Sequence, residues 1–370
     1  MNEDRASRYH RLKRQSGVVS LVWSVALLLT LALTNGSLAL RRAAEAAVPG
    51  GLASPFLVVV GYVALLWLIH EIGKLPIDFY RGFLLEKRYG LSNQRFKTWC
   101  STQAKGSALG ALLAMAAASI VYFCIRHWPV NWWLPAGLAF AVVVVGLAHL
   151  APVLLLPVFY RITPLQQGTL RARLMKLAER AGAQVLGAYE WGLSADTKKA
   201  NAALAGLGST RRILVSDTML AEYSEDEIEV VLAHELAHHV HGDIWKGLLF
   251  ESGLLVAGFY AAAWALRFSA APAGLAGVAD VAGLPVLLLA AGSVSLLMLP
   301  LAHAVSRAHE RSADRFALEL TRNPAAFMSA MRRLGAQSLA EEHPSRLVQW
   351  LFYSHPPMRE RIAAAKQFAG

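Results

Sequence analysis

The sequence predicts a mainly α-helical bundle that crosses a membrane about six times and carries a soluble part with a small β element. Three observations favour this fold class. The 370-residue chain is 55% hydrophobic and only 16% charged, whereas soluble domains average about 45–50% and about 25%. Its apolar residues gather in long stretches, and its mean hydropathy is +0.40. Between and after these stretches lie segments with the periodicity and turn signals of an ordinary soluble domain.

Six apolar stretches are long enough, or nearly so, to cross a bilayer, which takes about 20 residues. They comprise residues 17–40, 51–68, 106–125, 132–156, 244–266 and 284–303. The first resembles a signal peptide in one respect, because basic residues precede it and small residues follow it. Its apolar run exceeds the roughly 7–15 residues of such a peptide. We therefore favour an uncleaved anchor over a cleaved signal.

Basic residues are concentrated on one side of the predicted spans, which accounts for the net charge of +11. One group precedes the first span and another lies between the second and third spans, whereas the opposite side carries few. An excess of lysine and arginine marks cytoplasmic loops. We expect a cytoplasmic N-terminus, with residues 160–243 and the tail from Ser306 on the same side, and no nucleic-acid partner.

The polar segments have signals of their own. Residues 170–181 show the apolar spacing of an amphipathic helix, and residues 212–216 (RILVS) are typical of a short strand. Ser224 and Glu227 form a capping-box pattern, which predicts the start of a helix that runs to about His241.

We divide the chain into two domains. Residues 1–160 form an N-terminal membrane domain with four spans. Residues 161–370 form a second domain that includes two further spans, at about 244–266 and 284–303. The only cysteines, Cys100 and Cys124, are too few for a disulfide framework or a cysteine-based zinc site.

The capped helix contains the pattern His234-Glu235-Leu236-Ala237-His238. Residues four apart share a helix face, so both imidazoles can bind one ion. Imidazole suits Zn²⁺, and the glutamate between the histidines can act as general base on a water molecule. The alternative is a chance match on a surface helix. The helix is largely apolar, which indicates burial, and buried polar groups need partners.

A catalytic zinc site needs one more protein ligand. Residues 306–314 form a second polar cluster, in which Glu310 and Asp314 are four apart on one helix face. One carboxylate would bind the metal, and the other would hold a ligand histidine through its second ring nitrogen. The alternative is a solvated charged helix next to the membrane.

Taken together, these motifs resemble the integral-membrane zinc metalloproteases that include the type I CAAX prenyl proteases. The resemblance, to a bacterial-type member, extends from about Leu75 to Ile362, and its elements occur in the family's order. The matching segments are residues 79–91, 157–165, 201–202, 206, 211–218, 234–238, 306–314, 353–357 and 361.

The resemblance implies a role for each matching residue. His234, His238 and Glu310 would bind one Zn²⁺ per chain, and Glu235 would activate the water. Asp314 would support a ligand. Asn201 and His355 would steady the tetrahedral intermediate, with Arg361 supporting that end of the site. The substrate would pair as an added β-strand with the strand formed by Arg212, Ile213, Leu214, Val215 and Ser216.

The resemblance also implies a membrane-embedded endopeptidase that cuts C-terminal or membrane-associated peptide segments, including lipid-modified ones. Its partners would be these peptide or protein substrates and the lipid bilayer. The sequence departs from the family's usual pattern at two places. Residues 99–105 lack an aspartate, and Ala203 and Leu204 replace aromatic residues. Both departures concern substrate preference.

Other functions remain open alternatives. The first is a quality-control protease for membrane proteins with no prenyl requirement. A catalytically idle membrane scaffold is the second, although the intact Glu235 argues against it. A transporter would not account for the metal motif. The Ala/Arg-rich composition indicates a bacterial protein, and hence an inner-membrane location with a cytoplasmic active site.

Overall fold

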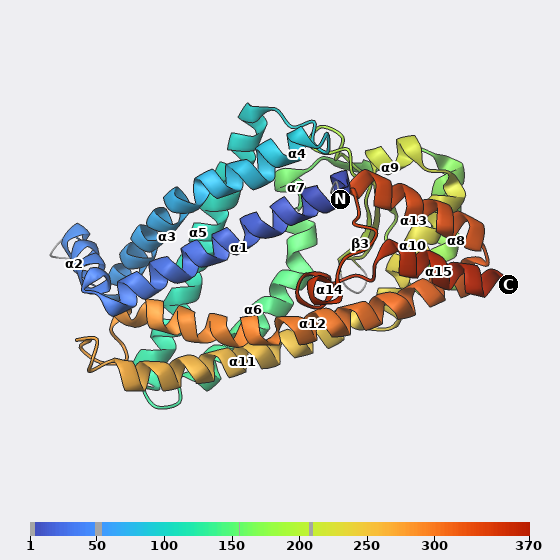
Figure 1. Cartoon of the computed structure of the whole chain (residues 1–370). Coiled ribbons are helices and arrows are strands. Elements are labelled where there is room, and N and C mark those ends of the chain that lie inside the picture. The colour runs from blue at the N-terminus through green and yellow to red at the C-terminus, as the bar shows by residue number, and fades with distance from the viewer. Residues whose placement is uncertain (1–3, 49–53, 155, 207–209) are drawn as a thin grey trace.

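The computed structural model describes residues 4–48, 54–154, 156–206 and 210–370 (Figure 1). Six long helices form a closed ring in which each helix packs against the next. In ring order these helices are α1 (Arg5–Leu33), α3 (Pro55–Phe79), α5 (Phe96–His127), α6 (Trp133–Leu154), α11 (Asp243–Ser269) and α12 (Leu284–Thr321). An apolar cavity of ≈ 420 Å³ is lined by residues of all six helices. The predicted fold class is confirmed.

Within the described residues, five helical segments are long and apolar enough to cross a membrane. They are Arg5–Leu33, Pro55–Arg88, Phe96–His127, Asp243–Ser269 and Val281–Thr321. The fourth predicted span coincides with α6, which contains the shorter apolar helix Trp133–Ala148. The start of the second predicted span, residues 51–53, lies outside the described residues.

The predicted limits of the first span, residues 17–40, are wrong. Helix α1 begins at Arg5, where the Asp4 side chain accepts a hydrogen bond from the Ser7 N–H. It ends at Leu33, because Thr34 is extended. A separate amphipathic helix, α2 (Gly36–Ala47), follows. Hydropathy alone does not detect this break, because apolar residues lie on both sides of it.

The end of the ring that carries α2 has its own core, which contains the fully buried Tyr62, Tyr122 and Trp132. The Ser37 hydroxyl lies 2.6 Å from the Tyr62 hydroxyl and donates to the Ala282 carbonyl at 2.6 Å. Arg41 and Asp280 form an ion pair. These contacts join α2, α3 and the 3-10 turn η4 (Val281–Gly283) at the end opposite the soluble part (Figure 1).

Two helices of the ring continue toward the soluble part. Helix α3 leads through a π-helical turn, η2 (Tyr80–Leu84), into α4 (Leu85–Arg88). Helix α12 is 38 residues long, so one helix carries both the sixth predicted span and the polar cluster at residues 306–314. The short α7 (Leu156–Phe159) leads to the sheet.

The soluble part contains a four-stranded sheet with strand order β1-β2-β4-β3. Its strands are β1 (Ile162–Pro164), β2 (Ala188–Trp191), β3 (Ala202–Ala205) and β4 (Arg212–Ser216). Strand β4 pairs with β2 in parallel and with β3 antiparallel. The prediction that residues 212–216 receive the substrate is therefore wrong, because both edges of β4 are already paired. In the described part of the chain, the unpaired edge next to β4 is that of β3.

Helices surround this sheet. They are α8 (Gly168–Arg180), α9 (Asp217–Glu222), α10 (Glu225–Val240), α13 (Pro324–Ser338), α14 (Arg346–Phe352) and α15 (Met358–Ala369). The common core includes the fully buried Leu170, Leu174, Ile213 and Phe327. The sequence predicted α8 and α10 within two residues at each end.

Helix α10 starts with the predicted capping box. The Glu227 N–H donates to the Ser224 hydroxyl at 3.3 Å, and the Ser224 N–H donates to Glu227 Oε2 at 2.8 Å. We expect Ser224→Ala to lower the free energy of unfolding by about 1 kcal/mol. Ser224→Thr, which keeps a capping oxygen, is the control. Thermal unfolding in detergent measures both, and equal melting temperatures would contradict the role of the cap.

Candidate metal centre

Helices α10 and α12 bring His234, His238 and Glu310 together. One ligand atom from each of these residues lies within 4.8 Å of the other two. His234 Nε2 is 3.3 Å from Glu310 Oε2, and His238 Nε2 is 3.3 Å from Glu310 Oε1. His234 and Glu310 are buried, and His238 is half-buried. The four-residue spacing of the histidines puts both rings on the face of α10 that contacts α12.

Carboxylates hold the other nitrogen of each ring. His234 Nδ1 lies 2.9 Å from Asp314 Oδ1, and His238 Nδ1 lies 3.0 Å from Asp243 Oδ2. Such contacts fix the tautomer and orientation of a ligand histidine. Both Nε2 atoms are consequently left on the Glu310 side.

The sequence reasoning missed Asp243. Helix α10 is followed by Gly242, whose φ of 67° lies in the left-handed region, and α11 begins immediately at Asp243. This tight turn returns the carboxylate to His238, five residues earlier in the chain. An acidic residue directly after a glycine at the end of the motif helix was the available signal.

The donor set fits a divalent metal ion. Two imidazole nitrogens and one carboxylate are the protein ligands found in many catalytic zinc sites. Glu310 Oε2 is buried and makes no well-aligned hydrogen bond within the described residues, although His355 Nδ1 lies 2.8 Å away. A buried oxygen of this kind normally has a partner. A cation at the common point of the three ligands would supply it.

The surroundings shift the acidity of the groups in the motif. Burial raises the pKa of the Glu235 carboxyl, although the neighbouring histidines oppose that shift. Burial disfavours a charged His238, but the carboxylates of Glu310 and Asp243 outweigh it and raise the pKa of His238 to about 9. In the metal-free protein a proton therefore occupies this ring readily, and a metal ion competes with that proton.

Arg361 lies behind the cluster. Its Nε donates to Asp314 Oδ2 at 2.8 Å and its Nη2 donates to Asp314 Oδ1 at 2.5 Å. Burial lowers the pKa of this guanidinium, but Asp314 outweighs burial and raises it. This two-point contact is the strong form of a charge-assisted hydrogen bond. Arg361 thus fixes Asp314, which in turn fixes His234.

A cavity of ≈ 330 Å³ opens beside the cluster. Glu235 lines it and forms no side-chain hydrogen bond within the described residues. Asn201 and His355 line it as well, and both are exposed. The Asn201 backbone is fixed by two 2.9 Å hydrogen bonds, one to the Ser216 hydroxyl and one from the Ser216 N–H.

The predicted site residues therefore all line this cavity, except Asp314 and the residues of β4. Asp314 stands behind His234 rather than in the cavity lining. Strand β4 contributes none of its residues, since it lies inside the sheet. The neighbouring strand β3 contributes Ala202. The arrangement can hold a metal ion, accept a proton from water at Glu235 and offer polar side chains on both sides of a bound peptide.

Two family models together match nearly the whole chain. Residues 164–369 match the model described as peptidase family M48. Residues 2–161 match the model described as the CAAX prenyl protease N-terminal region with five membrane helices.

Individual relatives agree with these matches. The chain is 29% identical over 366 residues to the uncharacterized metalloprotease YhfN of Bacillus subtilis, covering 98% of this chain and 85% of the relative. It is 24% identical over 302 residues to a probable CAAX prenyl protease 1 of Schizosaccharomyces pombe. This match covers 81% of this chain and 64% of the relative. The crystal structure of S. mikatae Ste24p has a similar fold, with a TM-score of 0.86 and 22% sequence identity. The match covers 98% of this chain and 87% of the Ste24p chain.

Proposed function

Because the chain belongs to peptidase family M48 and is a membrane metalloendopeptidase, we propose that it cuts peptide bonds with one Zn²⁺ held by His234, His238 and Glu310. The observation that carries this proposal is the convergence of these three side chains beside Glu235 in one cavity. Two imidazoles and a carboxylate leave a fourth position for water or substrate, as catalytic zinc requires.

In the proposed mechanism, His234, His238 and Glu310 would hold a Zn²⁺ ion, and when bound it would supply Lewis-acid chemistry to the scissile carbonyl and would make water more acidic. Glu235 accepts the proton of the attacking water and later delivers it to the leaving amine. The raised pKa that burial gives Glu235 suits a group that both accepts and returns a proton. Asn201 and His355 donate hydrogen bonds to the developing oxyanion, each worth about 3–4 kcal/mol by analogy with other oxyanion donors.

The peptide substrate would bind in extended form along β3, whose outer edge is unpaired within the described residues. An extended peptide added to a sheet edge gains main-chain hydrogen bonds without relying on particular side chains. Ala202, at the start of β3, lines the cavity together with Glu235. Main-chain pairing there would carry the scissile bond past the metal ligands.

We further propose a substrate class and a location. Relatives described as CAAX prenyl proteases suggest C-terminal, lipid-modified peptides. Residues 1–160 would act as the membrane domain and residues 161–370 as the peptidase domain, in a bacterial inner membrane with the active site on the cytoplasmic side. The basic N-terminal segment supports this orientation.

One observation favours a second function, proteolysis of membrane proteins without a prenyl requirement. Strand β3 reads AALA, so the edge proposed to bind substrate carries three alanines and one leucine, whereas the family pattern has aromatic residues there. Aliphatic side chains smaller than aromatic rings at that edge leave room for varied substrate residues.

Product mass spectrometry separates the two functions. The purified, zinc-loaded protein is given a farnesylated CAAX peptide and its unprenylated twin, and a chelator-treated sample serves as control. We expect cleavage of the farnesylated peptide alone. Equal cleavage of both peptides would favour the broader proteolysis, and cleavage that survives the chelator would contradict the zinc mechanism.

A further inference from the structure

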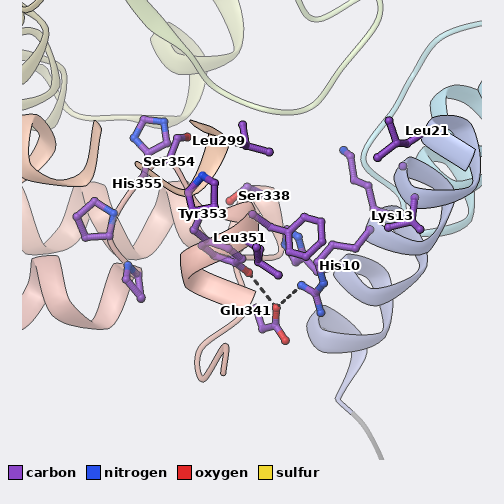
Figure 2. Close-up of a pocket in the computed structure, with 18 of the residues that line it drawn as sticks. His10, Lys13, Leu21, Leu299, Ser338, Glu341, Leu351, Tyr353, Ser354 and His355 are labelled. Carbon is purple, nitrogen blue, oxygen red and sulfur yellow. Dashed lines mark hydrogen bonds and ion pairs between the residues drawn. The ribbon is translucent and has the colours of Figure 1, made fainter. Parts of the chain in front are cut away.

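Two adjacent residues near the start of α1, Lys13 and Arg14, each form an ion pair with a glutamate from a distant part of the chain. Arg14 Nη1 donates to Glu341 Oε2 at 2.7 Å, and the Tyr353 hydroxyl donates to the same oxygen at 2.9 Å. Figure 2 shows Glu341 between α1 and Tyr353, with dashed lines to both sides. Tyr353 precedes His355 by two residues, so α1 reaches the segment that carries His355.

That segment is held at a second point. Arg307 Nη1, on α12, donates to the carbonyl oxygens of Gln349 at 3.0 Å and of Tyr353 at 2.6 Å. Tyr353 is thus fixed at its hydroxyl from α1 and at its carbonyl from α12. The side chains of Arg14 and Glu341 are only 20% and 10% exposed. Water therefore screens this ion pair less than it screens a pair on the open surface.

Lys13 makes the corresponding contact on the other side. Its Nζ donates to Glu86 Oε1 at 2.8 Å, and Lys199 Nζ donates to Glu86 Oε2 at 2.9 Å. The buried Tyr9 donates its hydroxyl to the same carboxylate at 2.5 Å. Lys199 precedes Asn201 by two residues. Glu86 belongs to the segment of residues 79–91 that the sequence comparison singled out and that the proposed mechanism does not use.

A pocket of ≈ 630 Å³ adjoins the Arg14 connection, and residues that include Lys13, Arg14, Glu341, Tyr353 and His355 line it (Figure 2). We propose that the start of α1 is a positioning element, in which Arg14 acts through Glu341 and Tyr353 on His355, and Lys13 acts through Glu86 and Lys199 on Asn201. This inference rests on the proposed function, since it assigns these two flanking residues to the oxyanion.

The Arg14 connection is tested with a charge swap. Arg14→Glu and Glu341→Arg each remove the ion pair, whereas the double variant restores it with reversed polarity. We expect each single variant to lower kcat about 10- to 100-fold, the range expected for a misplaced catalytic group, with little change in KM and in zinc content. The double variant recovers most of kcat. Arg8→Ala, an exposed arginine on the same helix, is the matched control and keeps wild-type kcat.

The Lys13 connection is tested in the same way. Lys13→Ala lowers kcat at unchanged KM, and Lys13→Arg, which keeps the positive charge, restores part of it. If the charge swap leaves the double variant as impaired as the singles, or if KM changes instead of kcat, the positioning role is overturned.

Amide hydrogen exchange gives a readout that does not depend on turnover. We expect the backbone amides of residues 352–355 to exchange faster in Arg14→Glu than in the wild type, and to return to wild-type rates in the double variant. Unchanged exchange in Arg14→Glu would overturn the inference even in an active enzyme. If the wild-type protein cuts no peptide, but Arg14→Glu still exchanges faster than the wild type, the proposed function is contradicted and the positioning contact is not.

Discussion

We expect Glu235→Gln to abolish peptide cleavage and to leave the metal in place. The amide has the size and shape of the carboxylate but cannot accept a proton from water. The turnover rate should therefore fall by at least the general-base contribution, which is about 10²–10⁴-fold. The metal stays bound because none of the proposed ligands, His234, His238 and Glu310, is altered. Product mass spectrometry measures the loss of cleavage, and elemental analysis of the purified protein measures the metal.

The neighbouring histidine provides a control for this variant. His239 follows the second proposed ligand, His238, is half-buried and is not among the residues that line the cavity. His239→Gln therefore keeps both metal and turnover, although it places the same amide one residue from the motif. Full activity in Glu235→Gln would eliminate this residue as the base, and loss of metal in that variant would show that its carboxylate has a structural task as well.

The sequence predicted those features that depend on interactions between residues close together in the chain. The four-residue spacing of His234 and His238 predicts that both rings lie on one helix face, and the capping box at Ser224 predicts where α10 begins. Span length and apolarity predicted the helical membrane bundle, which is confirmed. Local signals failed at Thr34, where α1 ends inside an apolar stretch, because the break changes backbone direction without changing hydropathy.

Long-range pairings were beyond the reach of the sequence pattern. Strand β4 reads as a strand from its residues, but its place between β2 and β3 depends on segments that the periodicity does not relate. The assignment of substrate to β4 was therefore wrong. The contact of Glu310 with His234 also joins separate helices, and the resemblance to a family, rather than the spacing, selected Glu310 over Asp314 as the ligand.

The contacts of α1 also join residues that are far apart in the sequence, which the sequence pattern could not predict. Arg14 and Glu341 are separated by 327 positions in the chain, and nothing in either local segment relates them. The basic residues of α1 predict an orientation in the membrane, because lysine and arginine are enriched in cytoplasmic segments. The structure adds a second task for two of them, since Lys13 and Arg14 also form ion pairs with Glu86 and Glu341.

We expect Glu310→Gln, in contrast to Glu235→Gln, to lose the metal and the activity together. The variant removes the single negative charge proposed to bind the ion, and the carboxylate that lies 3.3 Å from both Nε2 atoms. Partners that only support a ligand are already worth 10–100-fold in affinity, so losing a ligand weakens zinc binding by more than about 100-fold. A competition titration with a chromophoric chelator measures the affinity of each protein for zinc.

Glu319→Gln is the matched control, because Glu319 lies on the same helix, is 59% exposed and forms a surface pair with Arg315 at 3.7 Å. It keeps wild-type affinity and activity. Adding excess zinc restores part of the cleavage in Glu310→Gln but none in Glu235→Gln, since only the first variant lacks metal rather than a base. If Glu310→Gln binds zinc as tightly as the wild type, Glu310 is not a ligand, and Asp314 becomes the remaining carboxylate of the α12 cluster to test.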